Sequence, residues 1–110
     1  MEFGKTAHRD KFIANPKLRL REQVREVMRF HHYAIRTEEA YWQWIRRFIF
    51  FHNKRHPKDM AEAEISAFLS HLTTQDNAAR ATQQQALNAL IFLYRDVLLK
   101  SLGKKGSVLR

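Results

Sequence analysis

Apolar residues recur every three or four positions along four segments of this chain, which is the spacing of one face of an α-helix. No segment keeps the alternation of polar and apolar residues that a half-buried β-strand shows. Only three glycines and two prolines occur among the 110 residues, so helices meet few breaks. The pattern predicts an all-α domain of four helices at about residues 16–33, 37–53, 62–74 and 82–102, packed as a compact bundle or orthogonal array.

The second of these helices is the most aromatic part of the chain. Thr37 suits its N-cap, because a threonine hydroxyl accepts hydrogen bonds from the free amides of a first turn. Trp42 and Arg46 fall outside its apolar stripe, so we expect both to be exposed. The stripes expected to face the core are Tyr41, Trp44, Ile45, Phe48, Phe51 and His52 in this helix, and Leu20, Val24, Val27, Met28 and Phe30 in the first.

The charge of the chain is strongly positive and unevenly distributed. The formal net charge is +9 and the isoelectric point is near 10.4, which favours polyanionic partners. Residues 1–58 hold 14 Lys and Arg against six Asp and Glu, whereas residues 59–110 hold six against five. The first half is therefore the expected electrostatic face, with nucleic acid as the first candidate partner and an acidic protein or membrane surface as the second.

Two blocks of the sequence resemble a known family. The first carries Arg36-Thr37-Glu38, Tyr41, Trp44, Phe48, His52 and Arg55-His56-Pro57 in that order, and the second spans residues 82–98 at the expected separation. Together they resemble the N-terminal core-binding domain of integron integrases, a branch of the tyrosine recombinases in the phage integrase family. The resemblance implies a compact, four-helix SAM-like fold over residues 16–103. Residues 1–15 are then expected to be a disordered leader or vector-derived, and residues 104–110 a truncated linker to an absent catalytic domain.

The resemblance also implies a function in DNA recombination and integration. In this family the core-binding domain forms half of a clamp around double-stranded recombination-site DNA, and the catalytic domain forms the other half. Four protomers of a full-length recombinase assemble as a tetrameric synapse, whereas we expect the isolated domain to be a monomer. The lack of cysteine, of a signal-peptide pattern and of a membrane-length apolar run favours a cytoplasmic protein with no membrane partner. The resemblance implies that this protein is bacterial and associated with the nucleoid.

Ten side chains are candidates for contact with DNA. Cations, hydroxyl groups and helix-start amides can hold phosphates, and side-chain amides can pair with adenine edges. In the family, the second helix and the last helix approach the major groove, and position favours Thr82 and Gln83 within a polar helix start that also holds Gln84, Gln85 and Asn88. The candidates are Arg36, Thr37, Arg46, Arg47, Lys54, Arg55, His56, Arg80, Thr82 and Gln83.

Each candidate also has a simpler interpretation, and two positions depart from the family. Thr37 can act only as a cap, and charged or amide side chains can simply face water. Family members often carry a basic residue where this chain has Glu39, and a small hydroxyl residue where it has Ala81. The DNA contacts of those two family positions are therefore in doubt for this chain.

Catalytic and metal chemistry are not expected from this chain alone. The family's catalytic arginines, lysine, histidines and tyrosine nucleophile lie beyond residue 110, so no catalytic residue is assigned and the full-length parent is expected to be the enzyme. His52 and His56 have the spacing of a helical two-histidine metal site, but Asn53 stands where a zincin motif has glutamate. We expect no metal and no cofactor.

Three other interpretations remain open. A basic helical protein–protein interaction module would use Trp42 and Phe50 as anchors on an acidic partner or a membrane surface. A small histidine-based nuclease would depend on His52. A helix-turn-helix regulator would also read DNA with helices, but such proteins usually dimerise.

Overall fold

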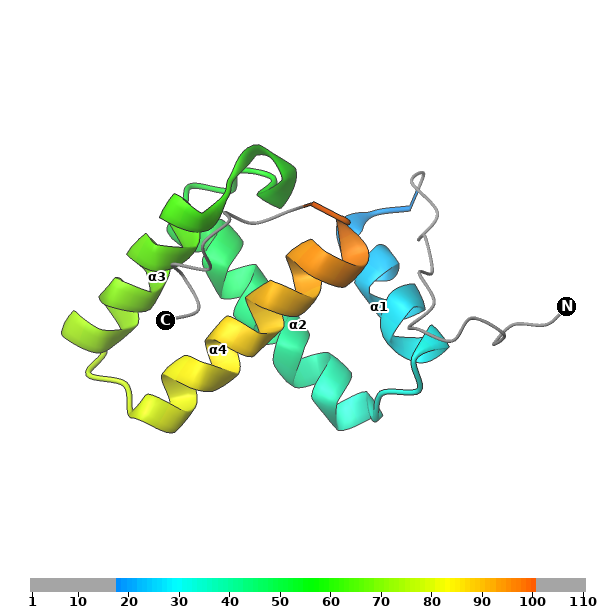
Figure 1. The fold of residues 1–110 in the computed structure, drawn as a ribbon, viewed down its shortest axis with the longest axis horizontal. Coiled ribbons are helices and arrows are strands. Elements are labelled where there is room, and N and C mark those ends of the chain that lie inside the picture. The colour runs from blue at the N-terminus through cyan, green and yellow to red at the C-terminus, as the bar shows by residue number, and fades with distance from the viewer. Residues whose placement is uncertain (1–17, 101–110) are drawn as a thin grey trace, which may run out of the picture.

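The computed structural model describes residues 18–100 and shows an all-α fold (Figure 1). Within that range the chain forms α1 (Leu20–Phe30), α2 (Ile35–Phe51), the short 3-10 turn η1 (Pro57–Asp59), α3 (Glu62–Thr74) and α4 (Arg80–Phe92), and α4 continues into the π-helical turn η2 (Leu93–Val97). No strand occurs among these residues. The prediction of a four-helix, all-α domain is confirmed. The expected leader at residues 1–15 and the expected linker at residues 104–110 lie outside the described residues.

The helices pack as an orthogonal array around α2 and α4, which cross at the centre of the molecule (Figure 1). α4 also packs against α3, while α1 packs against α2 and against η2. The α1–α2 connection is only four residues long, from position 31 to position 34, and the α3–α4 connection covers positions 75–79. One side of α2 remains exposed in this array, with Arg36, Gln43, Arg46 and Phe50 on it.

Each of the four α-helices contributes to a single core. Phe48 of α2 meets the ring of Phe68 of α3 at 5.7 Å and the ring of Tyr94 of η2 at 6.4 Å, both nearly edge-on, which is a favoured arrangement for aromatic pairs. The buried apolar side chains that form this cluster are Val24, Val27, Met28, Ile45, Phe48, Met60, Ile65, Phe68, Leu72, Ala86, Leu90, Phe92, Leu93, Tyr94 and Val97.

The ends of α1 and its exposed side differ from the sequence-based expectation. The helix ends at Phe30 because His32 adopts a left-handed backbone (φ 61°) and the Tyr33 amide then donates to the Met28 carbonyl at 2.9 Å. It begins at Leu20, and residues 16 and 17 lie outside the described residues. Phe30, expected in the core stripe, is 37% exposed at the last position of α1.

α2 begins earlier than expected, and Thr37 is not its N-cap. Ala34 is the N-cap, with an extended backbone and a carbonyl that accepts from the Glu38 amide at 3.0 Å, so Thr37 lies half-buried within the first turn. The Glu38 carboxylate is buried and accepts from Arg29 Nε of α1 at 3.0 Å. This ion pair fixes the start of α2 against α1, since a buried charge is tolerated only when it is paired.

The C-terminal end of α2 is a left-handed turn built without glycine. Asn53 (φ 60°) and Lys54 (φ 63°) both have positive φ, and the Lys54 amide donates to the Ile49 carbonyl at 2.8 Å. Asparagine tolerates this conformation well, whereas lysine adopts it at an energetic cost. The turn brings the Lys54 side chain back over the last turn of α2.

α3 has the predicted bounds, and α4 has a shifted start and an unexpected end. The α3 start is fixed by Glu64, whose carboxylate accepts from the Ala61 amide at 2.8 Å. α4 begins at Arg80, two residues before the predicted start, and its regular helix changes at Leu93 into η2. The predicted end at residue 102 lies outside the described residues.

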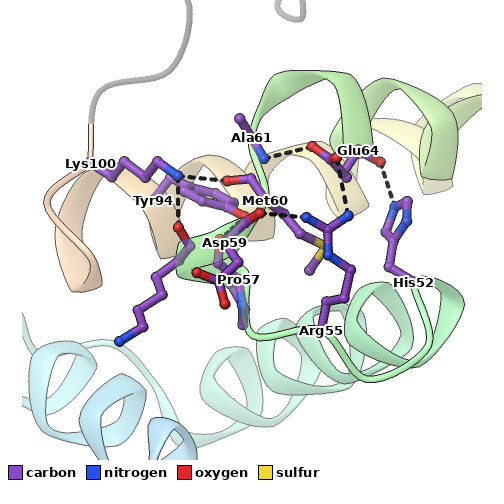
Figure 2. A network of polar contacts seen from close by, with 10 residues as sticks. His52, Arg55, Pro57, Asp59, Met60, Ala61, Glu64, Tyr94 and Lys100 are labelled. Atoms are coloured by element: carbon purple, nitrogen blue, oxygen red, sulfur yellow. Dashed lines mark hydrogen bonds and ion pairs between the residues drawn. The ribbon is translucent and has the colours of Figure 1, made fainter.

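Two side chains near the end of the described chain hold the loop between α2 and α3 (Figure 2). The Tyr94 hydroxyl donates to the Pro57 carbonyl at 2.6 Å. Lys100 Nζ donates to the carbonyls of Lys58 at 2.9 Å and Met60 at 2.8 Å, and it lies 5.9 Å from the centre of the Tyr94 ring. Because burial raises the pKa of Tyr94, its hydroxyl stays a neutral donor across the working pH range.

Replacing Tyr94 with phenylalanine is expected to lower the free energy of unfolding by about 1 kcal/mol, which is the usual net contribution of one buried hydrogen bond. The loss stays small because the Pro57 carbonyl keeps its bond from the Met60 amide at 2.9 Å. Urea unfolding measures it. Tyr41→Phe is the control, since Tyr41 is half-buried and makes no hydroxyl bond to another described residue; equal effects of the two substitutions would contradict a role for the Tyr94 bond.

Candidate nucleic-acid interface

The exposed side of α2 forms one continuous stripe that we call the α2 outer face. Most of its members follow one another at intervals of three or four residues, and Arg47 borders the stripe beside Arg46, so they share the side of the helix opposite the buried Ile45 and Phe48. All of them are exposed. The α2 outer face consists of Arg36, Glu39, Gln43, Arg46, Arg47 and Phe50, and Lys54 extends it beyond the end of the helix. It carries four cations and one carboxylate, so its charge is strongly positive.

Two cations of this face are arranged around one exposed aromatic ring. The Arg46 guanidinium lies 5.0 Å from the centre of the Phe50 ring, and Lys54 Nζ lies 5.6 Å from it. Phe50 is 48% exposed. Among the described residues neither cation has an acidic partner, so their charges remain available to a ligand. The ring orders both side chains without neutralising them.

Arg47 has a different environment at the edge where α2 meets α4. Its guanidinium lies 4.9 Å from the centre of the Trp44 ring, and its Nη2 donates to Asp76 Oδ2 at 2.8 Å. Trp44 Nε1 in turn donates to Gln85 Oε1 of α4 at 3.3 Å. These contacts make the α2 outer face continuous with the start of α4.

The start of α4 presents amide side chains to solvent along what we call the α4 outer face, defined by Ala81, Gln84, Gln85 and Asn88. Gln84 Nε2 donates to Asn88 Oδ1 at 3.0 Å, so these two amides are ordered together. The predicted residues Thr82 and Gln83 are half-buried instead. Gln83 Nε2 donates to the Ala78 carbonyl at 3.0 Å and thereby supports the helix start.

The side of α4 that faces the core could have been identified in the sequence from its alanines. Ala86 and Ala89 are fully buried and, with Leu90, define the inward side of α4. Alanine is too small to stand out in a search for apolar stripes, and Thr82 and Gln83 were predicted from their position in the family resemblance instead. Arg80, the remaining predicted residue of α4, is exposed in the first turn and has no acidic partner among the described residues.

Arg36 lies at the other end of the α2 outer face, beside an open hollow between α1 and α2. The hollow measures about 450 Å³ and is lined by Arg21, Arg36, Glu39, Ala40, Trp42 and Gln43. Trp42 was expected to be exposed, but it is half-buried and packs against the core. The Arg21 guanidinium covers it at 5.3 Å from the ring centre. α1 lies close enough to shelter this side of α2, which the periodicity of α2 alone does not reveal.

Arg55 and His56 brace the loop between α2 and α3, as Figure 2 shows for Arg55. Arg55 donates to the Asp59 carbonyl at 2.6 Å and pairs with Glu64 at 3.4 Å. His56 Nδ1 accepts from the Lys58 amide at 3.1 Å and so caps η1. The Ala61 amide, and to a lesser extent Arg55, lower the pKa of Glu64, so this carboxylate is ionised at neutral pH and keeps Arg55 in place.

His52 is held by the first turn of α3 and has no contact with His56 among those of the described residues. Its Nε2 donates to the Glu64 carbonyl at 2.9 Å, and its ring lies edge-on against Phe48 at 5.2 Å. Within residues 18–100 no group of three or more histidines and carboxylates is placed to hold a metal ion, and the chain has no cysteine. The structure also contains, in the part it describes, no helix long and apolar enough to cross a membrane.

Comparison with known proteins identifies the family. Residues 20–104 match the family described as phage integrase, N-terminal SAM-like domain. The chain is 46% identical over 81 residues to proteins named integrase/recombinase from Escherichia coli and from Pseudomonas aeruginosa. These 81 residues are 74% of this chain and 24% of each relative, so the chain spans about a quarter of the length of the curated relatives it matches. The chain belongs to the phage integrase N-terminal SAM-like domain family of the tyrosine recombinases.

Proposed function

We propose that this domain binds double-stranded DNA as the N-terminal core-binding part of an integron-integrase-like tyrosine recombinase. One observation carries the proposal: the α2 outer face, with Arg46 and Lys54 unpaired among the described residues, joins the exposed amides of α4 through the Trp44–Gln85 hydrogen bond. Cations and amides are thus combined on one continuous surface. Phosphate contacts from the cations would supply affinity, and amide contacts to base edges would supply sequence preference.

The proposed contacts differ in role along this surface. Arg36, Arg46, Lys54 and Arg80 reach phosphates, and Arg36 and Arg80 add their charge to the positive first turns of α2 and α4. Gln84, Gln85 and Asn88 reach base edges in the major groove, whose width admits a helix. Gln83 supports the start of α4 beneath these side chains, and Thr37 and Thr82 lie half-buried in the first turns of α2 and α4. Arg55 and His56 support the adjoining loop.

The recombinase context belongs to the same proposal. The domain, taken as residues 16–103, forms half of a clamp on recombination-site DNA and does not itself cut the strand. A catalytic domain of a full-length bacterial, cytoplasmic parent forms the other half, and protomers assemble as a tetramer on two sites. The isolated domain is a monomer. The names of its relatives, integrase/recombinase, support this assignment at the level of the enzyme class.

A protein-interaction module is less well supported by the geometry. That interpretation uses Trp42 and Phe50 as apolar anchors, but Trp42 packs against the core under Arg21 and Phe50 is flanked by two cations. Anchors of protein interfaces are usually large apolar side chains that a partner can desolvate. A cation-covered ring is better suited to a polyanion.

A fluorescence-anisotropy titration tests the proposal directly. The purified chain is titrated against an integron-type recombination-site duplex and a scrambled duplex of equal length at several salt concentrations. We expect the logarithm of the association constant to fall linearly with the logarithm of the salt concentration, with a slope of about −0.9 per phosphate contacted. Tighter binding to the recombination site supports base contacts by α4. Absence of binding to either duplex at low salt would refute DNA binding by this domain.

A further inference from the structure

From the position of Asp76 we infer that its carboxylate occupies the place of a DNA phosphate on Arg47 and thereby sets the domain's general affinity for DNA below what its cations could provide. The inference rests on the proposed DNA-binding function and adds an affinity-setting residue to it. Asp76 lies in the connection between α3 and α4, far in sequence from the helix that carries Arg47. No motif of the sequence points to it.

Arg47 is held in a fixed position at the α2–α4 seam. Its guanidinium lies 4.9 Å from the centre of the Trp44 ring, and the indole is itself tied to α4 by its hydrogen bond to Gln85. A guanidinium stacked on a fixed indole presents its N–H groups in a defined direction. Asp76 accepts from that direction, with 2.8 Å between Arg47 Nη2 and Asp76 Oδ2.

The Arg47–Asp76 ion pair is weak enough for another anion to displace Asp76. The Arg47 and Asp76 side chains are 47% and 41% exposed, and exposed ion pairs contribute little to stability. A carboxylate and a phosphodiester present similar anionic oxygen atoms to a guanidinium, so the two compete for the same donors. His71 Nε2 lies 3.9 Å from the other carboxylate oxygen, so Asp76 keeps a second neighbour when a phosphate takes its place on Arg47.

The consequence is a competitor for phosphate at the centre of the proposed surface. A phosphate can bind Arg47 only by displacing Asp76, so part of the binding free energy is spent in breaking the ion pair. This cost applies to every DNA sequence, because phosphates carry no sequence information. Asp76 therefore lowers non-specific affinity, which leaves a larger share of the discrimination to the amides of α4.

The test replaces Asp76 with asparagine, and Asp59→Asn is the matched control. Asp59 is an exposed aspartate in η1, away from the α2–α4 seam, and its replacement changes the net charge by the same amount. We expect Asp76→Asn to bind a scrambled duplex about 3–10-fold more tightly than wild type, with a salt slope steeper by about one phosphate contact. Asp59→Asn should change affinity by less than about 2-fold, since long-range charge is screened by salt.

A double-mutant cycle with Arg47→Gln tests whether Asp76 acts on DNA affinity through Arg47. In the Arg47→Gln background, Asp76→Asn should gain no more affinity than Asp59→Asn does, because the donor that a phosphate would take is gone. Asp76→Ser repeats the comparison with a smaller neutral side chain, and circular dichroism confirms that each variant is folded. A gain for Asp76→Asn equal to that of Asp59→Asn, or a gain that persists without Arg47, would overturn the inference.

The two proposals fail in different ways in this experiment. If neither wild type nor any variant binds duplex DNA at low salt, the proposed function itself fails. If wild type binds and the Asp76 and Asp59 variants behave alike, DNA binding stands and only the role of Asp76 is refuted.

Discussion

Replacement of both Arg46 and Lys54 by glutamate is expected to weaken duplex binding by about 100-fold at low salt, because two attractive contacts with phosphate become repulsive. Both side chains are exposed and lie against Phe50, and neither has an acidic partner among the described residues. The fold should therefore tolerate the change, unlike a reversal at Arg55, which would break its contacts with Asp59 and Glu64. Anisotropy titration measures the affinity and thermal melting checks the fold.

The control for this prediction is the single substitution Lys58→Glu, compared with Arg46→Glu and Lys54→Glu taken one at a time. Each of the three changes the net charge equally, but Lys58 lies in η1, outside the α2 outer face. We expect each substitution on the α2 side to cost about 10-fold and to reduce the salt slope by about one, and Lys58→Glu to cost much less. An equal loss at all three positions would mean that net charge alone drives binding and that the proposed surface is wrong.

Replacing Phe48 with alanine is expected to lower the free energy of unfolding by about 3–5 kcal/mol, the usual cost of emptying a fully buried phenylalanine site. Phe48 is fully buried, and its ring contacts Phe68 of α3 and Tyr94 of η2. One side chain of α2 thus joins three elements of the fold. For a small domain with a total stability of about 5–15 kcal/mol, this loss would leave little margin. Urea unfolding followed by circular dichroism measures it.

Phe50→Ala is the matched control for this prediction. It removes the same side chain from the same helix only two positions away, but from a site that is 48% exposed. We expect the free energy of unfolding to change by less than about 0.5 kcal/mol, as for most surface substitutions. A destabilisation as large as that of Phe48→Ala would show that the inward and outward sides of α2 are assigned incorrectly.

The number, order and type of the helices could be predicted from the sequence, because apolar spacing reports which residues must face a core. α3 was predicted to within its bounds, and its start coincides with the carboxylate of Glu64 bonding the Ala61 amide. The ends of α1 and α2 could not be predicted. They depend on left-handed turns at His32, Asn53 and Lys54, and none of these residues is glycine, the usual marker of such a turn.

The candidate site was only partly accessible to sequence reasoning, since composition identifies cations but not their partners. Arg47 pairs with Asp76, which lies 29 positions further along the chain, and no local spacing predicts such a contact. Arg55 likewise finds Glu64 only because the loop folds back on α3. By contrast, Arg46 lies on the exposed side of α2 as its helical position predicted. Periodicity therefore predicted the exposure of Arg46 but not the partial burial of Trp42. The free or paired state of a charge depends on the tertiary fold as well.

The left-handed backbone at Lys54 sets thermal stability and affinity against each other at one position. Lysine bears a cost of about 1 kcal/mol in this conformation that glycine avoids. Glycine at position 54 would make the turn more stable, and it would also remove one of the two cations beside Phe50. A laboratory selection for heat resistance alone would favour glycine at position 54. A selection that also required tight DNA binding would keep lysine and its strained turn.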